Sequence, residues 1–290
     1  MRMSDEAGRV GAAASSPGAC RLPGGVLREG RRLNEIRFRP LTGRLEEALA
    51  AGGEDDRSLP ERITGLLAVA IESLEGGPVD RATVAAMSVG DRRFLTRQLA
   101  KVVVGDAVWL SHPCRECRAP FDIHFRRSEL PVKPAGAGYP WAELELARHG
   151  RLRLRVPTGA DQARLAGLEE DAAIRRLVAD CLLEADSGFT VEALAASLTP
   201  PELAAIDAAL EEASPEVASE LEADCPECGT RQRVPVAADL GLGFGIDGLL
   251  GEVHRLALAY HWQEGEILDL PRWRRQHYLA LIDRERGLYR

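Results

Sequence analysis

Two pairs of cysteines constrain this sequence more than any other feature, because each pair has the spacing of half a metal site. Cys114 and Cys117 enclose two residues in "SHPCRECRAPFDIHF", and Cys225 and Cys228 repeat that spacing in "ELEADCPECGTRQRVPV". Structural zinc sites are usually closed by four soft ligands in a tetrahedron. Although 107 residues lie between the two pairs, together they predict one shared site for a structural Zn²⁺ ion.

The residues around each pair predict a β-hairpin with the cysteines at its turn. Phe121, Ile123 and Phe125 alternate with polar residues, which is typical of a strand. Gly229, directly after Cys228, suits a turn position of positive φ. The first turn has Arg118 at the same position, so its backbone is expected to be less relaxed. A redox dithiol needs its C-x-x-C at a helix N-terminus. The strand pattern therefore favours a metal site over a redox site.

Catalytic patterns are absent from the sequence. There is no H-E-x-x-H, no zinc-deaminase H-x-E with the cysteines, no G-x-S-x-G and no P-loop. His112 and His254 are interpreted as surface or packing residues, and the glycine-rich 241–245 as a flexible loop. We therefore predict a non-enzymatic protein with no catalytic residues.

Composition limits the compartment and the partners. No run of eighteen apolar residues occurs and the start has no apolar signal segment, so we expect a cytoplasmic protein without a membrane span. In that reducing compartment cysteines favour metal binding over disulfides. Cys181 fits the buried face of a helix, and Cys20 falls in the expected tail. The formal charge of −8 makes nucleic acid an unlikely partner.

Hydrophobic periodicity predicts a mostly helical α+β protein with a discontinuous zinc ribbon made of two hairpin knuckles. We expect helices over 59–77, about 160–185, 190–197, 200–213 and 246–260, another after Pro271, and one capped by Ser88 with Asp91. A hairpin is expected over 141–157. The domains follow as a disordered tail (1–31), an N-terminal region with the first knuckle (32–126), an inserted hairpin and helical block (127–218), and a second knuckle with C-terminal helices (219–290). Zinc would then fasten the insertion at its base.

The last helix carries a concentration of aromatic and arginine residues. Such side chains combine large apolar area with polar tips and are frequent anchors at protein interfaces. A local aromatic core is the alternative explanation. We predict that this segment binds partner proteins through Arg272, Trp273, Arg274, Arg275 and Tyr278.

Three segments together resemble the T-even-phage-type baseplate hub assembly proteins. They are "MSVGDRRFLTRQLAKVVVGD" with the following "CRECRAPFDI", the "CPECG" of the second pair, and "EVHRLALAYHWQEGEILDLPRWRRQHYLALI". The likeness covers roughly residues 80–285 and is most specific from 225 onward. It implies an assembly factor or minor hub component of a contractile phage tail or tail-like injection system, without enzymatic activity.

The resemblance implies a structural or assembly protein that binds hub or wedge subunits of a baseplate, either as a chaperone or as a permanent part, and the cysteine pairs predict that it contains structural zinc. The alternative is a zinc-ribbon adaptor in a nucleic-acid-associated complex, which a salt-dependent shift of DNA or RNA would reveal.

Overall fold

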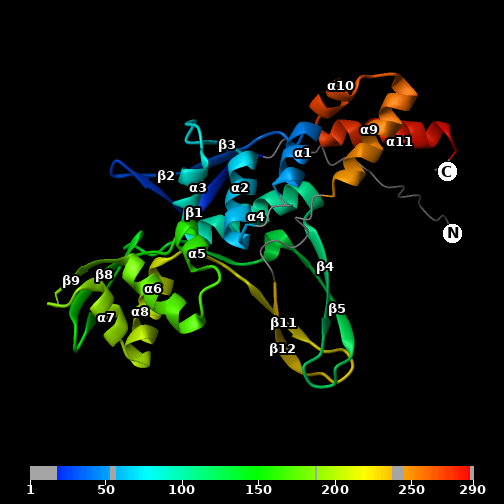
Figure 1. Ribbon diagram of the computed structural model, residues 1–290. Coiled ribbons are helices and arrows are strands. Elements are labelled where there is room, and N and C mark those ends of the chain that lie inside the picture. The colour runs from blue at the N-terminus through cyan, green and yellow to red at the C-terminus, as the bar shows by residue number, and fades with distance from the viewer. Residues whose placement is uncertain (1–17, 53–56, 187, 237–244, 288–290) are drawn as a thin grey trace, which may run out of the picture.

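A computed structural model describes residues 18–52, 57–186, 188–236 and 245–287 (Figure 1). A central body lies between a block of helices and strands on one side and three C-terminal helices on the other, and a long two-ribbon arm projects from it. The arrangement confirms the α+β class. No helix in these ranges is long and apolar enough to cross a membrane.

The central body packs four helices against a small antiparallel sheet of order β1-β2-β3. Its core includes Ile36, Leu67 and Leu95, each at most 1% exposed. Ser88 accepts a hydrogen bond from the Asp91 amide and begins the longest of these helices, as the sequence predicts. The elements are β1 (Cys20–Arg28), β2 (Arg31–Phe38), β3 (Ile71–Leu74), α1 (Gly43–Ala51), α2 (Leu59–Ala70), α3 (Arg81–Ala85) and α4 (Val89–Val104).

Two expectations for this region are wrong. The tail predicted over 1–31 is ordered from β1 onward, because β1 pairs with β2 through a turn in which Glu29 and Gly30 both have positive φ. Residues 1–17 lie outside the described ranges. The helix predicted over 59–77 ends at Ala70, since Ile71 becomes extended and β3 pairs with β2. Its apolar Ile71 and Leu74 are buried in the sheet rather than on a helix face.

The inserted block has its own sheet and its own core. The hairpin predicted over 141–157 is present as β7 (Trp141–Leu146) and β8 (Gly150–Arg155), and β9 (Leu182–Ala185) adds to β8. The expected helix over 160–185 is divided, because Gly167 with φ +84° interrupts it and β9 follows. The helices are α5 (Gly159–Leu165), α6 (Glu170–Cys181), α7 (Val191–Ser197) and α8 (Pro200–Ala213).

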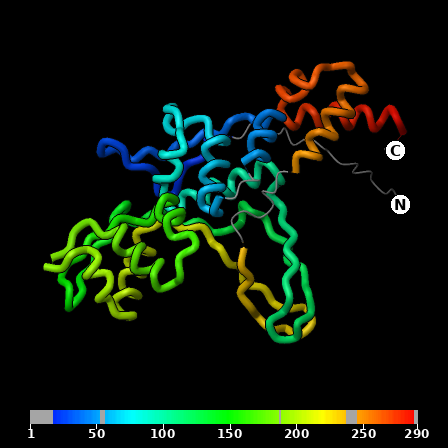
Figure 2. The backbone as a smooth tube through the Cα atoms, viewed as in Figure 1, coloured from blue at the N-terminus to red at the C-terminus, as the bar shows by residue number. Residues whose placement is uncertain are grey.

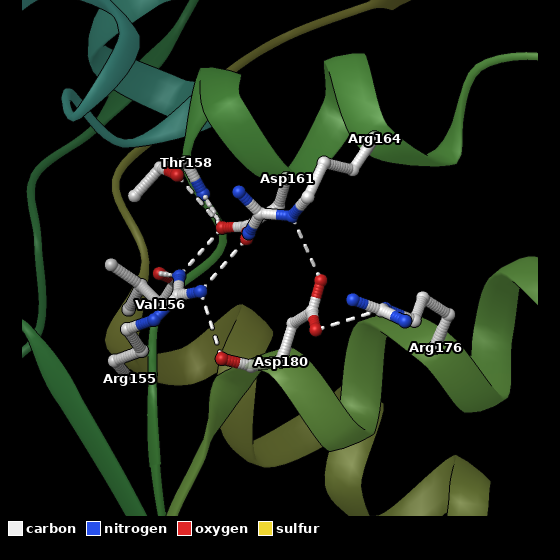
Figure 3. Close-up of polar contacts among 7 residues, drawn as sticks. All are labelled: Arg155, Val156, Thr158, Asp161, Arg164, Arg176 and Asp180. Carbon is white, nitrogen blue, oxygen red and sulfur yellow. Dashed lines mark hydrogen bonds and ion pairs between the residues drawn. The ribbon is translucent and has the colours of Figure 1, made fainter. Parts of the chain in front are cut away.

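A buried carboxylate joins strand β8 to helices α5 and α6 (Figure 3). Arg155 donates to both oxygens of Asp161 at 2.5 and 2.7 Å, and the amide of Thr158 donates to it at 2.8 Å. Arg164 bridges Asp161 to Asp180, which lies on α6. Burial opposes ionisation of Asp161, but the hydrogen bonds from Arg155 and Thr158 outweigh it and hold the Asp161 pKa below its usual value.

The inserted block is attached to the body at its base, through a second buried carboxylate. Asp91, at the start of α4, accepts hydrogen bonds from the amides of Gly24 at 2.8 Å and Gly25 at 3.0 Å. The Tyr139 hydroxyl donates to the Gly25 carbonyl at 2.7 Å and lies 3.2 Å from Asp91. Nearby, strand β6 (Val132–Lys133) pairs with strand β10 (Glu216–Val217). The segment that enters the block therefore meets the segment that leaves it.

The arm consists of two antiparallel ribbons that run side by side to a common end (Figure 2). One is β4 (Ala107–Pro113) with β5 (Pro120–Arg126), followed by a 3-10 turn η1 (Arg127–Glu129). The other is β11 (Glu220–Asp224) with β12 (Arg231–Pro235). Their facing sides share two small apolar clusters, of which Val108, Phe125 and Val236 belong to the one nearer the body. The sequence prediction of a β-hairpin around each cysteine pair is confirmed.

The C-terminal helices α9 (Ile246–Tyr260), α10 (Glu264–Asp269) and α11 (Arg272–Glu285) form a separate small core. They contact the body through α1. The amide of Arg272 donates to the Leu41 carbonyl at 2.8 Å, and the buried Arg275 pairs with Glu46 of α1 at 2.6 Å and with Glu252 of α9 at 2.9 Å. The glycine-rich loop predicted at 241–245 lies outside the described residues except for Gly245, which caps α9.

Candidate metal centre

The two hairpin turns at the end of the arm have the same backbone hydrogen bonds. In the first, the Cys114 amide donates to the Ala119 carbonyl at 2.9 Å and the Arg118 amide donates to the Cys114 carbonyl at 3.0 Å. In the second, the Cys225 amide donates to the Thr230 carbonyl at 3.0 Å and the Gly229 amide donates to the Cys225 carbonyl at 2.8 Å. Each turn therefore presents its two cysteines in the same way.

Both turns need a left-handed residue directly after the second cysteine. Gly229 has φ +70° and Arg118 has φ +64°. Glycine takes this conformation freely, whereas a side chain brings Cβ close to the backbone. The prediction that the first turn is the less relaxed of the two agrees with this geometry.

Packing between the ribbons brings the two turns together. Cys114 and Cys225 are buried with Phe121 and Val234 in one apolar cluster. The buried Gln232 side chain accepts a hydrogen bond from the Arg115 amide at 2.9 Å, which ties β12 to the first turn. The sequence prediction that the two cysteine pairs meet in space is confirmed.

The four sulfur atoms form a compact set. All four Sγ atoms lie within 4.8 Å of one another, with Cys114 Sγ 3.6 Å from Cys228 Sγ and Cys117 Sγ 3.7 Å from Cys225 Sγ. A tetrahedron with metal–sulfur distances of about 2.3 Å places its sulfurs roughly 3.8 Å apart. The four cysteines could therefore hold a metal ion, and their donor chemistry and spacing fit a tetrahedral one.

Hydrogen bonds around the sulfurs favour thiolates at two of the four positions. The Thr230 hydroxyl and amide lower the pKa of Cys228 to about 6, and the Cys117 amide lowers the pKa of Cys114. The Ala119 amide also favours the Cys117 thiolate, but burial and the three neighbouring sulfurs outweigh it and raise the Cys117 pKa to about 12. A bound cation would offset the repulsion that crowded thiolates produce.

The remaining cysteines and the nearby histidine lie apart from this set. Cys181 is fully buried in the core of the inserted block, as its place on a helix face predicts. Cys20 is half-buried on β1 against the body core, so the expectation that it lies in a tail is wrong. His112 bonds the Pro113 carbonyl at 2.8 Å and packs against Phe121.

Two supporting residues were not identified from the sequence. Gln232 links the ribbons, and Thr230 bonds the Cys228 sulfur at 3.3 Å. A signal existed for Gln232, because it alternates with the buried Val234 and Val236 on the inner face of its strand. Thr230 follows Cys228 by two residues, but nothing in the spacing shows that its hydroxyl points at the sulfur.

The predicted partner-binding residues on α11 do not form one surface. Trp273 is 54% exposed, and Arg274 is exposed beside Tyr278. Tyr278 is half-buried against Trp262, at 5.0 Å between ring centroids, and belongs to a local aromatic cluster. Arg272 reaches back to the carbonyl of Val103 on α4.

The prediction that Arg275 contacts a partner is wrong. Its side chain is 0% exposed, because two carboxylates from different helices pair with it. It joins the C-terminal helices to the body instead. A run of arginines on a helix does not show which of them points inward, since the carboxylates that hold Arg275 are 23 and 229 residues away.

Taken together, the fold and the centre define a mixed helix-and-strand protein built around a two-ribbon arm with a four-cysteine cluster at its end. Comparison with known protein families identifies it further. The model of the family described as T4 bacteriophage base plate protein matches residues 21–242, so this chain belongs to that family. The match includes the N-terminal sheet, which the sequence resemblance left out, and stops before α9. No curated protein and no solved structure matches the chain.

Proposed function

We propose that this protein is a non-enzymatic structural or assembly component of the baseplate of a contractile phage tail or tail-like injection particle, acting in assembly of the hub. The family match over residues 21–242 carries this proposal. Membership supports a structural role and association with other baseplate components. The protein would be made in the cytoplasm and taken into the particle as the baseplate forms.

Zinc is the proposed metal of the four-cysteine centre. Four thiolates satisfy a tetrahedral Zn²⁺ ion and leave no coordination position for a water molecule, which is the arrangement of structural sites. Sulfur distances of 3.6 and 3.7 Å support this geometry. The ion would hold the tips of the two ribbons together, and its binding energy would add to the stability of the arm.

Contacts to other proteins are better supported than contacts to nucleic acid. Exposed arginines of the second ribbon are paired with acidic residues across it, Arg231 with Asp224 at 3.0 Å and Arg233 with Glu220 at 3.8 Å. The formal charge of the whole chain is −8. Phosphate-binding surfaces carry an excess of positive charge.

Deletion of the gene in a strain that makes the particle tests the proposal. We expect electron microscopy to show tails without complete baseplates, and expression of the protein from a plasmid to restore them. A map of the restored particle should contain this chain if it is a permanent part. Normal particles from the deletion strain would contradict the proposed role.

A further inference from the structure

A cleft of about 540 Å³ opens where the body, the base of the arm and the inserted block meet. Its walls are largely apolar and include Val108 and Phe125 of the first ribbon and Val236 after the second. Four arginines also line it, namely Arg92, Arg93, Arg97 and Arg127. Apolar walls with a few convergent charged groups are typical of binding sites.

Arg92 is a buried cation without an anionic partner. Its side chain is 2% exposed and donates to the Thr64 hydroxyl and to the carbonyls of Val84 and Pro60. No carboxylate of the described residues pairs with it, and its Nε atom has no hydrogen-bond partner. Burial alone lowers its pKa to about 10. Buried charges in proteins are normally paired.

The other lining groups leave the positive charge in excess. Arg97 is 7% exposed and donates to the Leu130 carbonyl at 2.8 Å, and Arg93 is exposed at the cleft. Among the lining residues that the structure describes, Glu220 has the single carboxylate, and that carboxylate lies beside Arg233. Asp106, outside the lining, partly offsets the charges of Arg97 and Arg127, so the excess positive charge comes from Arg92 and Arg93. An occupant with a negative charge would therefore complement this cleft.

We infer that the cleft binds a short protein segment in which an aspartate or glutamate lies beside apolar side chains. The carboxylate would face Arg93 and Arg97, and the apolar side chains would cover Val108 and Phe125. Arg92, whose guanidinium packs against Gly159, would add its unpaired positive charge from behind the wall. A nucleic acid would bring a run of phosphates, whereas Arg93 is the one exposed arginine of the four that line the cleft. The inference rests on the proposed function only in naming the source, which would be a neighbouring baseplate subunit.

Selection of peptides from a random-sequence library on the purified full-length protein tests the chemistry of the cleft directly. We expect enriched peptides to contain Asp or Glu next to Leu, Ile or Phe. Arg93→Glu and Arg97→Gln should each weaken binding of these peptides roughly 30-fold or more, since each removes a partner of a desolvated carboxylate. Arg93 is exposed, so its variant should fold normally.

Arg21→Glu is the matched control, because it makes the same charge change on the exposed side of β1 and should leave peptide binding unchanged. Failure to enrich acidic peptides, or equal binding by all three variants, would overturn the inference.

A photo-crosslinking residue in place of the exposed Ser219, which lines the cleft, identifies the source in assembled particles. A crosslink to an acidic and apolar segment of another subunit is expected. Particles that contain the protein but give no such crosslink would overturn the assignment of the partner and leave the proposed function intact. Absence of the protein from both particles and assembly intermediates would instead contradict the proposed function. The peptide measurements would still decide which chemistry the cleft binds.

Discussion

The residue after the second cysteine of each turn controls how easily that turn forms. Arg118 has φ +64°, a conformation that costs an L residue roughly 1–2 kcal/mol. Glycine would remove this cost, but it would also destabilise the folded state by about 0.4–1 kcal/mol, because it raises the entropy of the unfolded chain. Arg118→Gly should therefore stabilise the metal-bound protein by about 0.5–1 kcal/mol. Urea unfolding with the metal present measures this change.

Gly229→Ala provides the opposite test in the other turn. A Cβ atom there would meet nothing within 4 Å, so the cost is that of the backbone conformation alone. We expect a loss of about 0.5–1 kcal/mol. If both variants left the unfolding midpoint unchanged, the two turns could not have the left-handed residues described above.

Asp161 should make the inserted block sensitive to acid. Its folded-state pKa lies below that of an unfolded aspartate, about 3.9, so its ionic contribution is fully present above that pH and is lost as pH falls through the folded pKa. Asp161→Asn should cost about 3 kcal/mol at neutral pH, because it replaces a buried carboxylate that holds the half-buried Arg155.

The free energy of unfolding of this variant, measured between pH 3 and pH 7, should fall less steeply at the acid end than that of the parent chain. Asp207→Asn, on the exposed side of α8, is the control and should follow the parent curve. A parallel curve for Asp161→Asn, displaced but equally steep, would show that other carboxylates cause the acid sensitivity.

Sequence patterns predicted the role of residues whose surroundings are set by neighbours close in the sequence. The cysteine pairs, the Ser88 cap and the buried Cys181 follow from spacings of a few residues. Arg92 and Arg275 could not be placed in this way, because their surroundings come from segments distant in the chain. Arginine is usually exposed, so pattern analysis assigns it to a surface unless a partner is known.

At the scale of elements, the metal centre should determine whether the two ribbons stay together. We expect one zinc ion per chain, measured by elemental analysis of freshly purified protein. Cys225→Ser leaves three thiolates, so zinc content and solubility should both fall, because metal-binding energy is also folding energy in such a centre.

Cys20→Ser is the matched control for this measurement, since Cys20 is half-buried on β1 outside the cluster and should not alter zinc content. Protein that is isolated with iron, or with no metal, would contradict the zinc assignment.

Helix α11 remains a candidate docking element through its exposed residues. Trp273→Ala should weaken capture of hub or wedge subunits by about 2 kcal/mol or more, because exposed tryptophans at interfaces are frequent anchors. Arg274→Glu should act in the same direction. Pull-down with purified subunits measures both, after each variant is shown to fold and to contain its metal.

Arg275 provides the contrast on the same helix. Arg275→Gln should lower stability rather than binding, because it leaves Glu46 and Glu252 without their shared cation. If Trp273→Ala and Arg274→Glu captured subunits normally, α11 would serve only the local core and its attachment to the body.

Strands with alternating residues and helices with clear caps were predicted from sequence, as the arm ribbons and α4 show. The missed elements are short ones that depend on a distant partner. Strand β3 continues directly from α2 and exists because β2 offers an open edge, and β9 likewise completes the sheet beside β8. Local periodicity cannot identify such edges.

At the scale of the whole molecule, the metal centre and the inserted block are at different places. The two ribbons of the arm end far from the inserted block (Figure 1), and the cysteine cluster lies in the turns at that end. The block joins the body through Asp91 and Tyr139 instead. Pairing of β6 with β10 already closes the excursion of the chain at its base. The prediction that zinc fastens the insertion at its base is therefore wrong, because the long arm separates the two.

This separation predicts independent local opening of the arm and the block. A metal that cross-links two distant segments stabilises a fold most when no other contact closes the loop between them. Here the pairing of β6 with β10 already closes that loop, so the metal has only the two ribbons of the arm to join. Removal of the metal with a chelator should therefore raise amide hydrogen exchange in 107–126 and 220–235 and leave 141–213 protected.

Tyr139→Phe should have the opposite effect. It leaves the buried Gly25 carbonyl without its hydrogen-bond donor, at a cost of about 1–3 kcal/mol. Amide exchange should then rise around 131–140 while the zinc content stays unchanged. Loss of protection throughout the inserted block on chelation would show that the centre holds the block after all, through coupling along the full length of the arm.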